Sequence, residues 1–298
     1  MNAQTRIRPA ERVAYAVGAA LFLSGLAHAV VLLAPGGSWL GPLSLRKAVT
    51  FGLSFGLTLA SVAWATSFLT VRARWRTALL GAFTVASVVE VLLVSVQAWR
   101  GVPSHFNFET PVDTAVSMTL AAGGGVLVLT VIGFTAAALV EPGPAAPSLR
   151  LAIRAGLVVL LVALATGAVM IGRGVVAARG GDPQLAYTTA GSLKPLHAVA
   201  MHAILVLPAL AWLLRFSRWP EAHRLLVVEV AVAADAVLTA VIGVESFTGT
   251  DPLAAPLPVL ALSALAALAL AGTGGYALSG VEPGSRFVRV RDGKARGR

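Results

Sequence analysis

Eight long apolar runs separated by short polar connections are the feature that most constrains this chain of 298 residues. Each run is about 20–28 residues long, which suits a helix that crosses a hydrocarbon core of about 30 Å. Residues that break helices, mostly Pro and Gly, mark the connections. The pattern predicts membrane spans at about 13–34, 48–70, 77–99, 114–140, 151–172, 193–214, 223–244 and 256–279.

The composition supports a membrane protein, because 57% of the residues are hydrophobic and only 12% are charged. A soluble domain carries about 25% charged residues. Continuous apolar runs favour helices, which satisfy their backbone N–H and C=O groups internally. We therefore predict an all-α, polytopic transmembrane helical bundle over residues 13–280. An N-terminal tail (1–12) and a basic C-terminal tail (281–298) flank it.

The distribution of basic residues predicts the orientation. With eight spans, roughly three quarters of the 23 Lys and Arg residues fall on the side that holds both termini. Both termini are therefore expected in the cytoplasm, with the chain in the inner (plasma) membrane of a bacterium and the lipid bilayer as its main partner. The net charge of +10 follows from this topology, so we expect no nucleic-acid partner.

The first run has an alternative interpretation. Three arginines, an apolar run and then Ala27-His28-Ala29 resemble a signal peptide with its cleavage site. The apolar run continues beyond that point through Val30–Leu33, which favours a membrane span. Cleavage would leave seven spans in the same orientation.

Several classes of chemistry are excluded by what the sequence lacks. Without cysteine there are no disulfides, thiolate metal ligands, iron–sulfur clusters or covalently attached c-type haem. There is no phosphate-binding loop of the Walker type. Small residues at Gly52 and Gly56, at 121–125 and at 272–275 are candidates for close helix packing.

Polar residues inside the spans gather toward the predicted outer side. His28 and His197 lie roughly 7 and 10 Å above the expected midplane. Ser87, Glu90 and Gln97 share one face of the third span. Because ionisable groups are costly in lipid, we expect a polar, outward-facing pocket between spans 1, 3, 4, 5 and 6. The loop after span 3 is expected to cover it, with Arg100, His105 and Asn107 reaching in. On span 7, Asp235 and Thr239 are one turn apart.

Three stretches together resemble a widespread family of bacterial multi-pass membrane proteins with no assigned biochemical function. The resemblance covers roughly residues 38–215. Family members often carry a second Lys where Thr50 stands and an Asp where Ser192 stands. The stretches are Lys47-Ala-Val-Thr-Phe-Gly-Leu-Ser54, Gln97-Ala-Trp-Arg-Gly-Val-Pro-Ser-His-Phe-Asn107 with Asp113, and Thr188-Thr-Ala-Gly-Ser-Leu-Lys-Pro-Leu-His197 with His202 and Leu207-Pro208.

Three classes of function remain open, and the sequence does not decide whether the protein is an enzyme. In the first, His28 and His197 are the axial ligands of a b-type haem. His202 would be the alternative partner of His28, Gln97 would line the pocket, and Arg100 or Arg173 would bind the propionates.

In the second, a membrane hydrolase uses zinc held by histidines and a carboxylate near the outer surface. The candidates for this site are His28, His197, His105, Glu90 and Asp113, and His202 is a further metal candidate. In the third, a transporter, sensor or accessory subunit binds a small molecule or lipid in the same pocket. The candidate catalytic residues are Glu90, Arg100, His105, Asn107 and Asp113.

Overall fold

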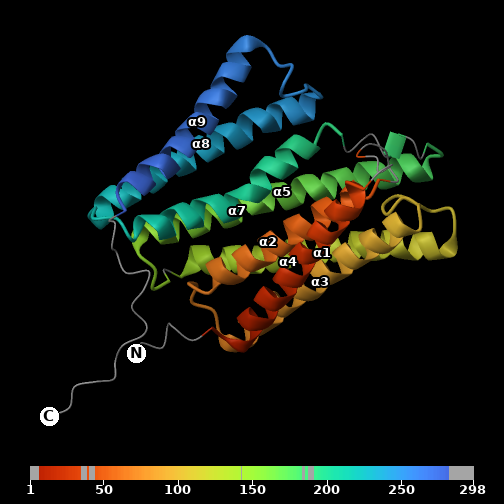
Figure 1. Ribbon diagram of the computed structural model, residues 1–298, viewed down its shortest axis with the longest axis horizontal. Coiled ribbons are helices and arrows are strands. Elements are labelled where there is room, and N and C mark those ends of the chain that lie inside the picture. The colour runs from red at the N-terminus through yellow and green to blue at the C-terminus, as the bar shows by residue number, and fades with distance from the viewer. Residues whose placement is uncertain are drawn as a thin grey trace.

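The computed structural model describes residues 7–34, 39, 44–141, 143–182, 185–186 and 191–281. In this part of the chain, eight helices are long and apolar enough to cross a membrane (Figure 1). They are α1 (Pro9–Leu32), α2 (Arg46–Thr66), α3 (Ala73–Trp99), α4 (Pro111–Val140), α5 (Pro147–Arg179), α7 (Lys194–Leu214), α8 (Glu221–Thr248) and α9 (Leu257–Ser279).

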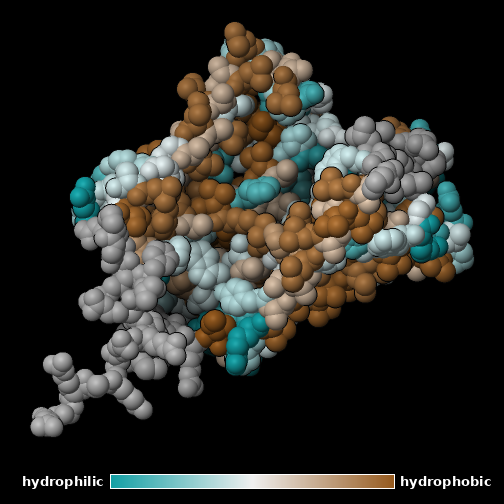
Figure 2. Space-filling model, in the orientation of Figure 1, coloured by the Kyte–Doolittle hydropathy of each residue, from teal (hydrophilic) through white to brown (hydrophobic). Residues whose placement is uncertain are grey.

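The predicted all-α architecture with eight spans is confirmed. Several helices begin one or more turns before their apolar run, because proline at a first helical position is already set for the helix and has no N–H to leave unpaired. Pro9 starts α1 and Pro147 starts α5 in this way. The helix α5 also runs to Arg179, beyond the predicted end of its span. Figure 2 shows apolar surface along the flanks of the helices, as lipid contact requires.

The helices pack mainly as neighbours in the chain. The closest partners are α1 with α2, α5 with α7, and α8 with α9. The helix α9 touches α8 and, to a lesser extent, α7, so it lies on the outside of the bundle (Figure 1). We call one end of the bundle the predicted outer end. It holds the C-terminal ends of α1, α3, α5 and α8 and the N-terminal ends of α2, α4, α7 and α9.

Among the described residues, one of the three predicted small-residue motifs brings the backbones of two helices into contact. A Cβ atom on Gly52 would lie 2.6 Å from the Cα of Gly25, and one on Gly56 would lie 2.7 Å from the carbonyl oxygen of Gly18. These two glycine pairs let the backbones of α1 and α2 touch. In contrast, Gly124, Gly125 and all three glycines of residues 272–275 face open space.

Candidate functional site

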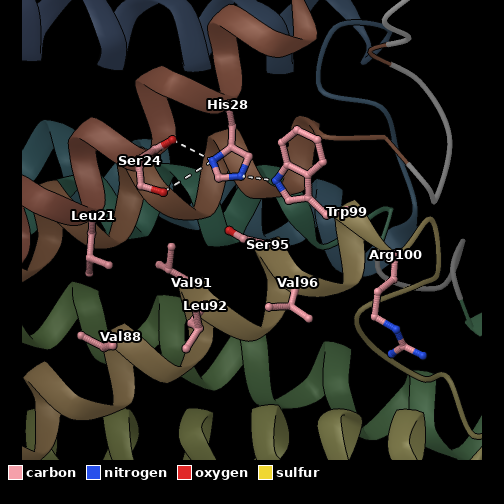
Figure 3. A pocket seen from close by; sticks show the side chains of 10 residues that line it. All are labelled: Leu21, Ser24, His28, Val88, Val91, Leu92, Ser95, Val96, Trp99 and Arg100. Carbon is pink, nitrogen blue, oxygen red and sulfur yellow. Dashed lines mark hydrogen bonds between the residues drawn. The ribbon is translucent and has the colours of Figure 1, made fainter.

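A groove of about 590 Å³ lies between α1 and α3 (Figure 3). Apolar side chains form most of its wall, and polar groups gather where α1 and α3 approach the predicted outer end. The lining residues are Leu21, Ser24, His28, Val88, Val91, Leu92, Ser95, Val96, Trp99 and Arg100. We expected a polar pocket walled by five spans. The groove in the structure is mostly apolar, and its walls come from α1 and α3 alone.

The groove is open to the outside of the bundle. Leu92 is 57% exposed and Trp99 is 63% exposed, although both line the groove. Such large apolar side chains on the flank of a membrane helix face lipid. A molecule would therefore reach the groove sideways, from the bilayer.

His28 has a hydrogen bond at each ring nitrogen. Its Nε2 accepts from the indole Nε1 of Trp99 at 3.0 Å, and an indole N–H can only donate. The proton of the imidazole is therefore on Nδ1, which donates to the carbonyl oxygen of Ser24 at 2.7 Å. Figure 3 shows this chain of contacts joining α1 to α3 at one end of the groove. A metal or haem iron could use Nε2 only after the bond to Trp99 breaks.

Ser95 is the polar group in the groove that has no partner. Its hydroxyl oxygen is buried and forms no hydrogen bond in the described part of the chain. Serine hydroxyls in helices usually bond to a backbone carbonyl one turn earlier. The free hydroxyl of Ser95 therefore leaves a hydrogen-bonding position within the groove.

A second polar group, the outer network, joins the ends of α3 and α4. We define it as Gln97, Arg100, Thr110 and Asp113. The carboxylate of Asp113 accepts from Arg100 Nη1 at 2.7 Å, from Gln97 Nε2 at 2.9 Å and from the Thr110 hydroxyl at 2.6 Å. Thr110 is also the N-cap of α4, since its hydroxyl accepts from the backbone N–H of Asp113 at 3.1 Å.

The outer network is a structural unit, because its charges and hydrogen bonds are matched. Arg100 also donates to the side-chain oxygen of Gln97. The Arg100 guanidinium therefore bonds to two other members of the network, Gln97 and Asp113. Gln97 is fully buried and Asp113 nearly so. In Figure 3 the Arg100 guanidinium points away from His28, so this residue contributes its stem to the groove and its charge to the network.

The loop between α3 and α4 is held down by Asn107 and Phe106. The backbone N–H of Asn107 donates to the Ser117 hydroxyl at 3.2 Å, and that hydroxyl donates back to the Asn107 carbonyl at 3.0 Å. Phe106 has a φ of 61°, a left-handed conformation that is rare for a bulky residue. Its ring occupies the space that a Cβ on Gly174 of α5 would need, at 2.4 Å.

His105 stays neutral because of its surroundings. Burial lowers its pKa to about 3, and the nearby charge of Lys47 acts in the same direction. Its ring packs against Phe51 of α2 and bonds through Nδ1 to the Ser104 hydroxyl at 2.9 Å. Neither His105 nor Asn107 lines the groove. The loop therefore packs over α2 and α5. The prediction that His105 and Asn107 reach into the pocket does not hold for this groove.

Glu90 is buried deep in the interface between α3 and α4. Its Oε1 lies 2.8 Å from the place where Gly123 would carry a Cβ, so the missing side chain of that glycine makes room for the carboxyl. Ser87, Glu90 and Gln97 are all buried, which confirms that they share one interior face of α3. Glu90 forms no hydrogen bond within the described residues, and it does not line the groove.

The remaining candidates lie elsewhere. The Nδ1 of His197 bonds to the Ala163 carbonyl of α5 at 2.7 Å, and the ring packs on Gly167. His202 bonds to the Ala198 carbonyl of its own helix at 2.5 Å. Arg173 lies over the Phe247 ring at 5.9 Å. None of the three lines the groove that contains His28.

A metal site made from His28, His197 and His202 does not form in the described residues. No three His, Asp or Glu side chains in that part of the chain are placed to hold a metal ion. The physical reason is packing: His28 is bonded across to α3, whereas His197 is bonded across to α5. The haem pair is divided in the same way, because His28 lines the groove and His197 does not.

Sequence reasoning missed Trp99 and Ser95. Trp99 ends an apolar run close to charged Arg100, a position where indole rings commonly mark the membrane interface. Ser95 lies one turn before Trp99, which was the available signal that both face one way. Comparison with known proteins adds no family, since no family model, curated protein or solved structure matches this chain.

Proposed function

We propose that the protein binds an amphipathic molecule of the membrane in the groove between α1 and α3. The observation that carries the proposal is the combination of an apolar wall, exposed to lipid, with an unpartnered buried hydroxyl at Ser95. The proposal agrees with the prediction of a ligand pocket that contains His28. It adds that the ligand is a lipid or another amphiphile.

The apolar wall suits a hydrocarbon chain. Val88, Val91 and Leu92 continue with Val96 along just over two turns of α3, and Leu21 lines the groove from α1. An acyl or isoprenoid chain buried there gains contacts at no hydration cost, because it comes from lipid. Selectivity must then come from the polar part of the ligand.

The polar end suits a hydrogen-bond acceptor. Ser95 supplies a free hydroxyl, while the Trp99 indole N–H donates to His28 Nε2 and His28 Nδ1 is bonded to the Ser24 carbonyl. Arg100 is neutralised by Asp113, so the groove has no uncompensated cation to select an anion. A carbonyl or ester oxygen at the depth of Ser95 is therefore the group we expect to be recognised.

Photo-crosslinking tests the proposal. The full chain in vesicles would be exposed to a phospholipid that carries a diazirine in its acyl chain, and the adducts would be mapped by peptide mass spectrometry. We expect adducts concentrated on residues 21–28 and 88–99 and competed by unlabelled lipid. Leu92→Trp should remove most of them by filling the groove.

The matched control is Leu129→Trp on α4, since Leu129 is also a lipid-exposed leucine at 68% exposure and lies outside the groove. Ser95→Ala should lower occupancy about fivefold, the value of one ordinary hydrogen bond. Adducts spread evenly over the lipid-facing helices, or equal labelling in the two tryptophan variants, would show that the groove holds no preferred ligand.

A further inference from the structure

Unsatisfied oxygen atoms concentrate on α8. Eight buried side-chain N or O atoms lack a hydrogen-bond partner in the described part of the chain, and five of them belong to this helix. Asp235 Oδ2 and Thr239 Oγ1 are two of these, and both oxygens of the Glu245 carboxyl are two more. Buried polar atoms are nearly always hydrogen-bonded, so five unpaired atoms on one helix need a physical explanation.

Asp235 and Thr239 lie one helical turn apart near the middle of α8, and both are more than nine-tenths buried. The pair is therefore about 6 Å apart along the axis, on one face. Glu245, 4% exposed, follows about 9 Å further toward the predicted outer end. The unpaired oxygens thus run from the middle of the membrane toward one surface.

In the part of the chain that the structure describes, Asp235 forms no ion pair with a positively charged side chain. On α7 the titratable groups are Lys194, His197 and His202, and these histidines bond to backbone carbonyls. On α5, Arg173 lies over the Phe247 ring. The helix α9 carries no Asp, Glu, Lys, Arg or His, and the other groups on α8 are Glu221, His223, Arg224, Glu229 and Glu245. In the described residues, none of these forms a hydrogen bond or ion pair with Asp235.

A bare carboxylate in that position would cost several kcal/mol. Binding of a cation would neutralise the carboxylate. The number of oxygen atoms around Asp235 limits which cation can bind. Divalent metal ions take about six oxygen ligands or more, and the neighbouring helix backbones have no free carbonyls to add. A proton needs one oxygen.

We propose that Asp235 is a reversible proton-binding site in the middle of the membrane, with the Thr239 hydroxyl as the hydrogen-bond donor to its deprotonated form. The unpaired Glu245 carboxyl lies between this site and the predicted outer end. The site is independent of the groove, because no residue of α8 lines the groove.

Dicyclohexylcarbodiimide tests this directly, because it partitions into lipid and reacts with protonated carboxyls. The carboxyl proton moves to a carbodiimide nitrogen and the carboxyl oxygen bonds to the central carbon. The full chain in liposomes would be labelled at a series of pH values, digested and mapped. We expect an adduct on Asp235 that falls as the pH rises and returns when the pH is lowered before the reagent is added.

Two variants sharpen the result. Thr239→Val should raise the pH of half-labelling by about one unit, since it removes one hydrogen bond to the charged form. Thr248→Val is the matched control, because the Thr248 hydroxyl bonds only to backbone carbonyls and to Thr250, and it should leave the midpoint unchanged.

The proposal is overturned if wild-type Asp235 takes no adduct at any pH while the folded protein is intact. It is also overturned if the labelling does not depend on pH, or if Na⁺ at constant pH protects Asp235, which would make it a metal-cation site. An unchanged midpoint in Thr239→Val would contradict the role of Thr239. The outcomes measured on wild-type protein do not depend on how well the variants fold, because that peptide map needs no variant.

Discussion

Asp113 and Asp235 are both buried aspartates on membrane helices, yet their surroundings differ completely. Asp113 lies at the N-terminal end of α4 and accepts hydrogen bonds from Arg100, Gln97 and Thr110. Asp235 lies in the middle of α8 and accepts none within the described residues. One carboxylate therefore has its partners built into the fold, whereas the other has none in the described residues and is the one we propose to bind a proton reversibly.

The largest expected effect comes from removing the carboxylate of Asp113, the aspartate that has partners. Asp113→Leu should lower the free energy of unfolding by about 3 kcal/mol, because it leaves the buried Gln97 amide and the Arg100 guanidinium without their acceptor. Titration with a denaturing detergent in mixed micelles measures this change. The double variant Asp113→Leu/Arg100→Met should regain part of the loss. If the single variant were as stable as wild type, the outer network would not be structural.

A smaller effect is expected where the loop above the outer network meets α5. Gly174→Ala should cost about 2 kcal/mol, since a Cβ there would lie 2.4 Å from the Phe106 ring and the loop must shift. Gly172→Ala is the matched control on the same helix, because that position faces open space. Equal unfolding free energies for the two variants would mean that Phe106 does not anchor the loop.

The sequence predicted the two aspartates differently, and for clear physical reasons. Hydrophobic periodicity places each polar residue on a helix face, which is why the buried face of Ser87, Glu90 and Gln97 could be predicted. Arg100 and Asp113 were predicted as candidate catalytic residues, and their pairing was not predicted. Periodicity does not say which helix a face meets. That choice depends on packing between distant segments, such as Gly25 against Gly52.

The same limit explains the histidines. Similar depth made His28 and His197 look like one pair, but depth is a single coordinate. The structure turns His28 toward α3 and His197 toward α5, so their predicted partnership in a haem or zinc site is not formed. The groove itself could not be predicted, because it is the space left where α1 crosses α3. The orientation and the resemblance to a family stay predictions.

An effect of intermediate size is expected for His105 in the loop between α3 and α4, and it depends on pH. With its pKa lowered to about 3 by burial, His105 takes up fewer protons in the folded protein than in the unfolded chain below a pH of about 6.5. Stability is therefore complete above pH 6.5 and falls as the pH drops below it, by at most about 1.4 kcal/mol per pH unit. His105→Gln should remove this slope. An identical acid profile for wild type and variant would contradict the burial of a neutral imidazole.

The smallest expected effect concerns Asp235 at acid pH, and it grows as the pH rises. Below a pH of about 4, where this carboxyl holds a proton in both the folded and the unfolded chain, Asp235→Asn replaces one neutral group by another of nearly the same shape. The free energy of unfolding should then change by less than about 0.5 kcal/mol. Asp113→Asn is the matched control, and it should destabilise by about 1 kcal/mol or more, since the charge-assisted bond to Arg100 is lost. Above a pH of about 4 the unfolded wild type loses the proton that the folded protein keeps, so wild type should become less stable than Asp235→Asn by up to about 1.4 kcal/mol per pH unit, until the folded protein also releases the proton. Curves that run parallel at all pH values would place no titrating group at Asp235, and the contrast with Asp113 would then be one of packing alone.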